Sequence, residues 1–313
     1  MMSAEKRRAW IEFTRPFTLL PPAVGMVSGA CSAFGAHRAV VTGGAAVVAV
    51  LLGALVAALL NAASNALNQI HDLALDRVNK PSRPLPRGVI TLGEARAATA
   101  VLYALAVLIA FLIRPAGTPE VGWIVAFTAV LTWLYSAPPV RARNSWWLGP
   151  LVIAIPRGLL LKVAGWGVLA PIASDREPWI LGGVFFLYLL GAAPTKDFAD
   201  MEGDRQGGAS SLPIRFGPLR AAKIISAFLP LPGFFLAVLP WISVGGRPLL
   251  ALPQIPAAVV GTLLMLHGAF VGRWMIRKNE LLIDPKDRRC WTHMYLLMME
   301  LQTAAAALYF FEA

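Results

Sequence analysis

The chain has 313 residues, of which 57% are hydrophobic and 14% are charged, and its formal net charge is +11 at pH 7. This composition excludes a soluble globular domain and an intrinsically disordered chain. It predicts an all-α polytopic membrane protein that forms a single domain over residues 1–313. The positive charge does not indicate nucleic-acid binding, because the basic residues lie in short segments between apolar runs rather than on one folded face.

Apolar runs recur along the whole chain, and each is long enough, or nearly long enough, to cross about 30 Å of hydrocarbon as a helix. They lie near residues 17–36, 39–67, 92–113, 120–137, 148–169, 178–195, 221–242, 250–272 and 291–311. We therefore expect nine transmembrane helices in a bundle. The proline and glycine residues within several runs are compatible with this prediction, because neighbouring helices accommodate such breaks.

Basic residues are distributed unevenly between the connections. Of the 28 Lys and Arg residues, 22 lie in the N-terminal segment or in the connections after the second, fourth, sixth and eighth runs. Positive charge marks the cytoplasmic side, so the N-terminus and these connections are predicted to be cytoplasmic, at the inner membrane if the source is bacterial. Arg15, just before the first run, is then either a membrane-surface anchor or a residue that faces an anionic ligand.

The second run ends in a polar stripe formed by Asn68, Asp72 and Asp76. A spacing of four residues places these side chains on one face of a continuous helix. Carboxylates beside hydrocarbon must face the bundle interior or a wet cavity. The stripe therefore predicts a pocket that opens to the cytoplasm, and the basic residues Lys80 and Arg83 follow directly after it.

The connection between the fourth and fifth runs contains Tyr135 and Ser136 immediately before an Ala-Pro-Pro sequence. The prolines should end the fourth helix there and leave two hydroxyl groups at the cytoplasmic mouth. The fifth run carries Arg157 and Lys162. These two residues either meet an acidic group of a ligand, or they are a structural pairing or snorkelling side chains.

A second acidic block follows the sixth run, where Asp197, Asp200 and Asp204 again share one helical face and Lys196 precedes them. Both acidic blocks end in Asp-Arg, and both are followed by Leu-Pro. This similarity suggests a weak internal repeat.

Two acidic blocks on the same side of the membrane can face each other across one cavity. Five carboxylates there would repel one another strongly unless cations were present, and Mg²⁺ with substrate phosphates suits such oxygen ligands. The interleaved basic residues favour a metal-bound diphosphate over a pure cation site. Because the cavity lies in a membrane, the other end of that substrate is expected to be hydrocarbon.

At these residues the sequence resembles the UbiA-type intramembrane prenyltransferase superfamily. The similarity rests on the Asn-x3-Asp-x3-Asp motif from Asn68, the Asn-Lys-Pro-x-Arg-Pro-Leu-Pro run from Asn79, Tyr-Ser-Ala-Pro-Pro from Tyr135, and the second aspartate motif. It implies that the aspartates bind Mg²⁺ and diphosphate and that the enzyme ionises a polyprenyl diphosphate to an allylic carbocation. The implied metal-binding and catalytic residues are Asp72, Asp76, Asp200 and Asp204. The implied substrate-binding residues are Asn68, Arg83, Tyr135, Ser136, Lys196 and Asp197.

The acceptor is predicted to be lipophilic or aromatic, and a quinone precursor resembling homogentisate or hydroxybenzoate is favoured. The block from Leu67 to Asp72, followed by Asn-Lys-Pro, resembles homogentisate-type enzymes. Glu202-Gly-Asp-Arg followed by Ser211-Leu-Pro is also similar to the chlorophyll-synthase and geranylgeranylglyceryl-phosphate branches. A membrane terpene cyclase is a further alternative. A divalent-cation or phosphate transporter is the alternative from another class, because intramembrane acids also mark ion pathways.

Overall fold

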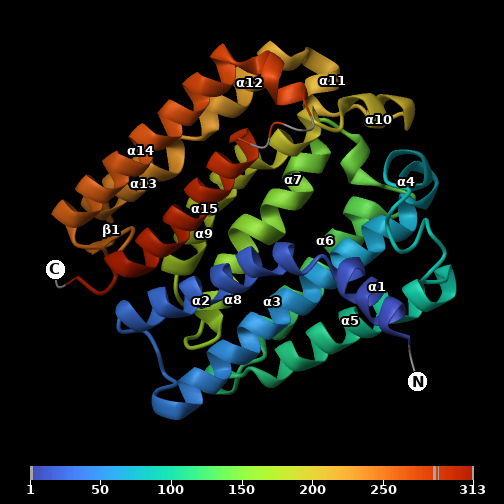
Figure 1. Ribbon diagram of the computed structural model, residues 1–313. Coiled ribbons are helices and arrows are strands. Elements are labelled where there is room, and N and C mark those ends of the chain that lie inside the picture. The colour runs from blue at the N-terminus through green and yellow to red at the C-terminus, as the bar shows by residue number, and fades with distance from the viewer. Residues whose placement is uncertain (1–2, 285–286, 288, 312–313) are drawn as a thin grey trace.

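A computed structural model describes residues 3–284, 287 and 289–311, and in these residues the chain forms a helical bundle (Figure 1). The helices of the first half are α1 (Ala4–Thr14), η1 (Pro16–Leu19), α2 (Leu20–Gly35), α3 (Gly43–His71), α4 (Leu73–Asn79), α5 (Leu92–Leu112), η2 (Pro115–Gly117), α6 (Glu120–Ser136) and η3 (Ala142–Asn144). The middle of the chain forms α7 (Leu148–Ala154), η4 (Ile155–Leu160), α8 (Leu161–Gly167), α9 (Glu177–Ala192), η5 (Ala193–Phe198), α10 (Met201–Gln206) and α11 (Leu212–Phe216). The remaining elements are α12 (Pro218–Phe228), α13 (Leu231–Val238), η6 (Leu239–Trp241), the hairpin strands β1 (Ser243–Val244) and β2 (Arg247–Pro248), α14 (Gln254–Arg277), η7 (Asn279–Ile283) and α15 (Arg289–Leu308).

Within the described residues, seven helical stretches are long and apolar enough to cross a membrane. They are Ala4–Gly35, Gly43–His71, Leu92–Leu112, Leu148–Gly167, Glu177–Phe198, Pro218–Trp241 and Gln254–Arg277. The predicted count of nine is therefore not confirmed. The run at 120–137 is an apolar helix of only 17 residues, α6. The last run forms α15, whose sequence includes charged and amide side chains such as Glu300 and Gln302.

The outer surface of the bundle is strongly apolar. Large hydrophobic side chains are exposed on several long helices, including Leu51 on α3, Leu108 and Leu112 on α5, Phe127 on α6, and Leu263 and Phe270 on α14. In water such a surface would be costly, whereas in a bilayer it contacts lipid tails. The exposed surface thus supports the prediction of an integral membrane protein.

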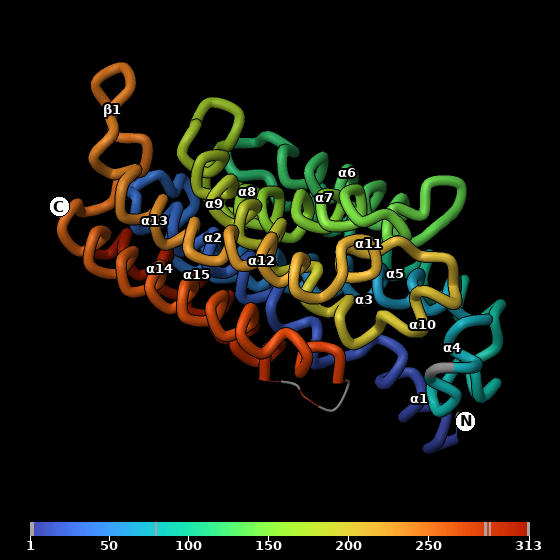
Figure 2. The backbone as a smooth tube through the Cα atoms, turned by 90° about the horizontal axis from the view of Figure 1, so that it is seen from above, coloured from blue at the N-terminus to red at the C-terminus, as the bar shows by residue number. Residues whose placement is uncertain are grey.

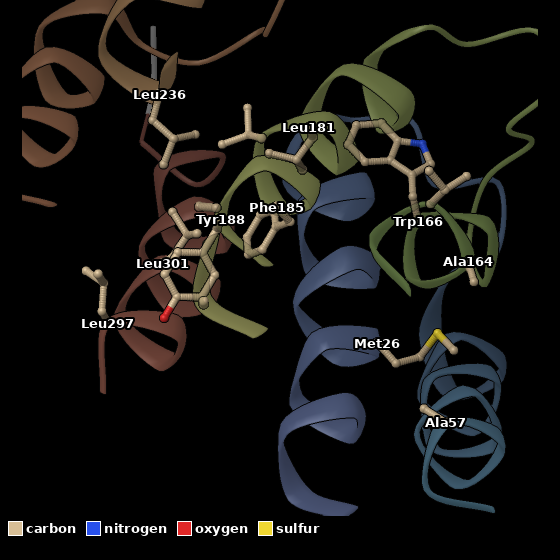
Figure 3. Packing of buried hydrophobic residues seen from close by; sticks show 14 of the residues in the cluster. Met26, Ala57, Ala164, Trp166, Leu181, Phe185, Tyr188, Leu236, Leu297 and Leu301 are labelled. Carbon is tan, nitrogen blue, oxygen red and sulfur yellow. The ribbon is translucent and has the colours of Figure 1, made fainter. Parts of the chain in front are cut away.

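Buried side chains join helices that lie far apart in the sequence. Figure 3 shows Met26 of α2 near Ala57 of α3, and Phe185 and Tyr188 of α9 beside Leu297 and Leu301 of α15. The packing of α2 against α8 is especially close. A Cβ atom added at Gly29 would lie 2.7 Å from the carbonyl oxygen of Lys162 and 2.8 Å from Cα of Gly165. Small residues allow such backbone contact between membrane helices.

Several of the long helices are interrupted. The fifth predicted run is divided into α7, a π-helical turn η4 that contains Pro156, and α8. Both views place α4 and α10 at the same end of the bundle, opposite the β1 hairpin (Figures 1 and 2). These two short helices follow breaks at Asp72 and at Asp200, one in each acidic block.

Candidate functional site

A cavity of about 710 Å³ lies inside the bundle and reaches the end that carries α4 and α10. Its lining comes from η1, α2, α3 and α4 in the first part of the chain, and from α6, η3, α7, η4, α8, α9, η5, α10 and α15 in the rest. Four aspartates, Asp72, Asp76, Asp200 and Asp204, line it together. The two acidic blocks, separated by more than a hundred residues, therefore share one chamber.

The local backbone explains how each block presents its carboxylates. Asp72 has φ −95° and ψ 7°, which ends α3 and begins α4, and Asp200 has φ −98° and ψ 2° at the start of α10. In both blocks the aspartate four residues later donates its backbone N–H to the carbonyl of the first, at 2.7 Å for Asp76 and 2.8 Å for Asp204. The two blocks thus have the same local structure, in agreement with the suggested repeat.

This geometry corrects the prediction that each block occupies one face of a continuous helix. Asp72 and Asp200 adopt dihedral angles from the sparsely populated bridge region, which breaks the helix at each aspartate. Asn68 consequently belongs to α3 and Asp76 to α4, although both side chains line the cavity. In the second block η5 ends at Phe198, so Asp197 and Asp200 do not share a helix.

Each carboxylate of the first block is paired with arginine. Asp76 accepts a short hydrogen bond from Arg83, and Asp72 accepts one from Arg143. The second oxygen of Asp72 accepts from Nη2 of Arg141 at 2.9 Å. Charge-assisted hydrogen bonds of this kind fix the orientation of the carboxylates.

Two basic side chains connect the blocks across the chamber. Nη2 of Arg143 lies 3.5 Å from Oδ1 of Asp204, and Nζ of Lys80 lies 3.7 Å from Oδ1 of Asp200. Arg143 therefore contacts one aspartate from each block. Its loop is anchored beside the second block, because the N–H of Ser210 donates to the carbonyl of Asn144 at 2.8 Å.

Sequence reasoning missed Arg143. It was interpreted only as one of the basic residues in a cytoplasmic connection, as was Arg141. The available signal was position, since both arginines follow the Tyr-Ser-Ala-Pro-Pro motif within a few residues. Arg15, for which two interpretations were left open, also lines the cavity.

Eight of the ten predicted site residues line the cavity: Asn68, Asp72, Asp76, Arg83, Tyr135, Lys196, Asp200 and Asp204. Ser136 and Asp197 do not. Ser136 is fully buried and its Oγ has no hydrogen-bond partner in the described part of the chain. Asp197 accepts a hydrogen bond from Nζ of Lys196 at 2.6 Å. Asp197 can therefore position that lysine without itself lining the chamber.

The chamber has an excess of positive charge. Six basic side chains line it, compared with the four aspartates: Arg15, Lys80, Arg83, Arg143, Arg157 and Lys196. Burial raises the pKa of Asp204 above its ordinary value, and the guanidinium of Arg143 opposes that shift. A chamber of this composition suits an anion that carries several charges.

The donor set also fits Mg²⁺. Within the described residues, no group of three or more His, Cys, Asp or Glu side chains is arranged to hold a metal ion without other ligands. Mg²⁺ is usually bound by one or two carboxylates together with waters and substrate phosphates, so a dedicated protein cage is not required. The pairs Asp72 with Asp76 and Asp200 with Asp204 supply hard oxygen ligands to the lining of the same chamber.

The lining away from the aspartates is largely apolar and aromatic. Ile153, Leu161 and Met298 contribute to it, and the rings of Phe17 and Trp291 lie 5.6 Å and 5.2 Å from the ring of Tyr295. This part of the chamber suits a hydrocarbon chain or a flat lipophilic group.

The two basic residues of the fifth run have different surroundings. Lys162 is 1% exposed, and its Nζ donates to Oγ of Ser28 at 2.7 Å and to Oε1 of Gln302 at 2.6 Å. The same ammonium group lies 4.1 Å from the ring centre of Phe185. Lys162 therefore joins α2, α8, α9 and α15 as a structural residue, whereas Arg157 lines the cavity.

Comparisons with known proteins agree with this architecture. The model of the UbiA prenyltransferase family matches residues 19–296. A bacteriochlorophyll synthase 33 kDa chain from Cereibacter sphaeroides is 28% identical over 98% of this chain and 94% of its own length. A digeranylgeranylglyceryl phosphate synthase from Methanosphaera stadtmanae is 30% identical over 56% of this chain and 60% of its own.

A solved structure has the same fold. The UbiA homologue from Archaeoglobus fulgidus, bound to GPP and Mg²⁺, superposes with a TM-score of 0.72 over 96% of this chain and 99% of that one, at 18% sequence identity.

Proposed function

The chain belongs to the UbiA prenyltransferase family, and we propose that it transfers a prenyl group from a prenyl diphosphate to a lipophilic acceptor of the chlorophyll or glyceryl-phosphate type. The relatives described above support this acceptor class. They do not support the quinone precursor that the sequence favoured. The short segments that begin at Glu202 and Ser211 resemble the branches to which these relatives belong.

The observation that carries the proposal is the convergence of four aspartates and five of the six cations at one end of a chamber whose remaining lining is largely apolar. The charged end matches a diphosphate, and the apolar part matches the prenyl chain. We place the charged end at the cytoplasmic surface, since the basic connections lie there by the positive-inside rule.

The proposed reaction begins with cleavage of the bond between C1 of the prenyl chain and the diphosphate oxygen, whose electron pair leaves with the diphosphate. The resulting allylic cation is attacked by an acceptor oxygen, which forms the new C–O bond, and any proton on that oxygen is released. Arg83, Arg143 and Lys196 line the chamber where the leaving group would lie and can stabilise its growing negative charge. The apolar lining excludes water, which would otherwise capture the cation.

Asp72, Asp76, Asp200 and Asp204 are the residues that would hold Mg²⁺ with the diphosphate. When bound, the ion neutralises charge on the leaving group and so favours its departure.

The test is incubation of purified protein with prenyl diphosphates of several lengths and three acceptors: a chlorin carboxylic acid, an alkylglyceryl phosphate and a hydroxybenzoate. Mass spectrometry identifies the products. We expect Mg²⁺-dependent prenylation of the chlorin or the glyceryl phosphate. Prenylation of the hydroxybenzoate alone would restore the quinone-precursor hypothesis, and a cyclised hydrocarbon formed without an acceptor would indicate a terpene cyclase.

Two substitutions on α10 provide a matched pair. Asp200 lines the cavity, whereas Glu202 does not and its side chain is 77% exposed. We expect Asp200→Asn to reduce Mg²⁺-dependent diphosphate release at least 100-fold, on the order of losing one metal ligand. Glu202→Gln should leave the rate unchanged. Equal rates for both variants would remove the aspartates from the proposed site.

A cation transporter would need acidic groups along a path through the bundle. In the part of the chain that the structure describes, the acidic residues that line the chamber are confined to the end with α4 and α10. This distribution favours the enzyme.

A further inference from the structure

A guanidinium group projects into the cavity at membrane depth without a counter-charge. Arg157 lies in the π-helical turn η4, its side chain is exposed, and it lines the main cavity. Among the described residues it has a hydrogen bond to Asn61 but no ion-pair partner. A cation within a transmembrane bundle is costly, and such residues usually mark a functional site.

The position of this guanidinium is well defined by its neighbours. Nη2 of Arg157 donates to Oδ1 of Asn61 at 2.8 Å, and Nδ2 of Asn61 in turn donates to the carbonyl of Thr18 at 2.8 Å. The backbone of η4 cannot shift easily, because a Cβ atom at Gly158 would lie 2.6 Å from Cα of Phe186. Single π-helical turns of this kind occur frequently at functional sites.

Arg157 lies deeper in the bundle than the aspartates. Its partner Asn61 precedes Asp72 by eleven residues on α3, a distance of about 16 Å along the helix axis at 1.5 Å per residue. Four other cations at the mouth of the cavity can neutralise the diphosphate leaving group: Lys80, Arg83, Arg143 and Lys196.

Arg157 also lines a second, smaller cavity next to the main one. A smaller cavity of about 50 Å³ shares Pro22, Ser64, Arg157 and Leu161 with the main one. The rest of its lining is mainly apolar and comes from α2, α3, α6, η4 and α8. The smaller cavity is too small for more than one or two water molecules, so a ligand with its acidic group on Arg157 would place its apolar body in the main cavity.

We propose that Arg157, oriented by Asn61, binds an anionic oxygen of the acceptor and so selects acceptors that carry an acid. This inference rests on the proposed function, because it concerns the second substrate of the same cavity. The anionic group is a carboxylate if the acceptor is a chlorin acid, or a phosphate if it is a glyceryl phosphate. In either case a planar guanidinium offers two parallel hydrogen bonds to the oxyanion.

The experiment measures acceptor binding in the absence of donor and Mg²⁺, so that it does not depend on turnover. Binding of a chlorin monocarboxylic acid is compared with that of its methyl ester, and binding of an alkylglyceryl phosphate with that of its dimethyl ester. We expect the wild type to bind at least one acid about 10- to 100-fold more tightly than its ester, as for a hydrogen bond to a charged group. The acid that is preferred identifies whether a carboxylate or a phosphate is recognised.

Variants at three positions test the assignment. Arg157→Gln should abolish the preference for the acid, and Arg157→Lys should retain part of it, because lysine keeps the charge but not the planar fork. Asn61→Asp should also weaken the preference for the acid, since the new carboxylate would form an ion pair with Arg157. Lys162→Met is the matched control from the same membrane span and should keep the full preference.

Donor binding, followed by thermal protection with Mg²⁺ and a prenyl diphosphate, separates the possible failures. The inference is overturned if Arg157→Gln retains the acid preference, if the wild type has none, or if Arg157→Gln weakens donor binding as strongly as acceptor binding. If the wild type prefers the acid but never releases diphosphate, the proposed function fails and the binding assignment stands.

Discussion

Removal of Arg143 should destabilise the protein in a way that Mg²⁺ reverses. Arg143 contacts Asp72 from the first acidic block and Asp204 from the second. The side chains of Arg143 and Asp204 are only 17% and 11% exposed. The Arg143→Ala variant would leave Asp204 without an ion-pair partner in the described part of the chain.

The expected magnitude follows from the geometry. At the 3.5 Å separation of Nη2 and Oδ1, an effective dielectric constant of about 20 gives an attraction of about 5 kcal/mol. Removal of one member of a buried pair costs about 3–5 kcal/mol. Because both side chains keep some contact with solvent, we expect about 3 kcal/mol, which corresponds to a decrease in Tm of about 5–10 °C for a chain of this size.

The assay is thermal unfolding of detergent-solubilised protein, followed by tryptophan fluorescence, with EDTA and with millimolar Mg²⁺. Added Mg²⁺ should recover much of the lost Tm in Arg143→Ala, because a divalent cation replaces the missing positive charge between the aspartates. Arg87→Ala is the control. Arg87 pairs with Glu5 at 2.7 Å, but the two side chains are 44% and 66% exposed, so this pair is worth at most about 1 kcal/mol. If Arg143→Ala and Arg87→Ala have equal Tm values in EDTA, or if Mg²⁺ fails to raise the Tm of Arg143→Ala, the bridging role is refuted.

Three further predictions test the donor site and the packing. Lys196→Ala should raise the apparent KM for the prenyl diphosphate about tenfold by removing a cation from the chamber, and unchanged donor kinetics would remove Lys196 from the site. Gly29→Ala should lower stability by about 1–3 kcal/mol because the added methyl group would meet the backbone of α8 at 2.7 Å. Gly183→Ala, where the same addition meets nothing within 4 Å, should not destabilise, and equal Tm values for the two variants would contradict the packing argument. Chelation of divalent cations by EDTA should stop diphosphate release while the fold, measured by circular dichroism, is retained.

The class of the protein and the chemistry at the mouth of its cavity could be predicted from the sequence. Hydropathy is a sum over neighbouring residues, so the apolar runs indicated helices without any knowledge of their packing. The two aspartate blocks could also be recognised in the sequence, because each occupies only a few consecutive turns. Eight of the ten residues expected at the site line one cavity.

The helix breaks at Asp72 and Asp200 were not predicted, since each block reads as a continuous helical pattern. Whether a helix continues through such a residue depends on the partners that its polar groups contact in the folded protein. At Asp72 these partners are Arg141 and Arg143, about 70 residues away in the sequence.

The local sequence by itself determined that this is a helical membrane protein with two acidic blocks that suit a metal-bound diphosphate. Only the tertiary structure decided which cations meet those acids and how two basic residues on the same membrane span differ. Lys162 is enclosed by Ser28, Gln302 and Phe185, whereas Arg157, five residues earlier, projects into the cavity. The physical reason is that the surroundings of a buried charge come from helices distant in the sequence, and no local pattern records which of them will approach it.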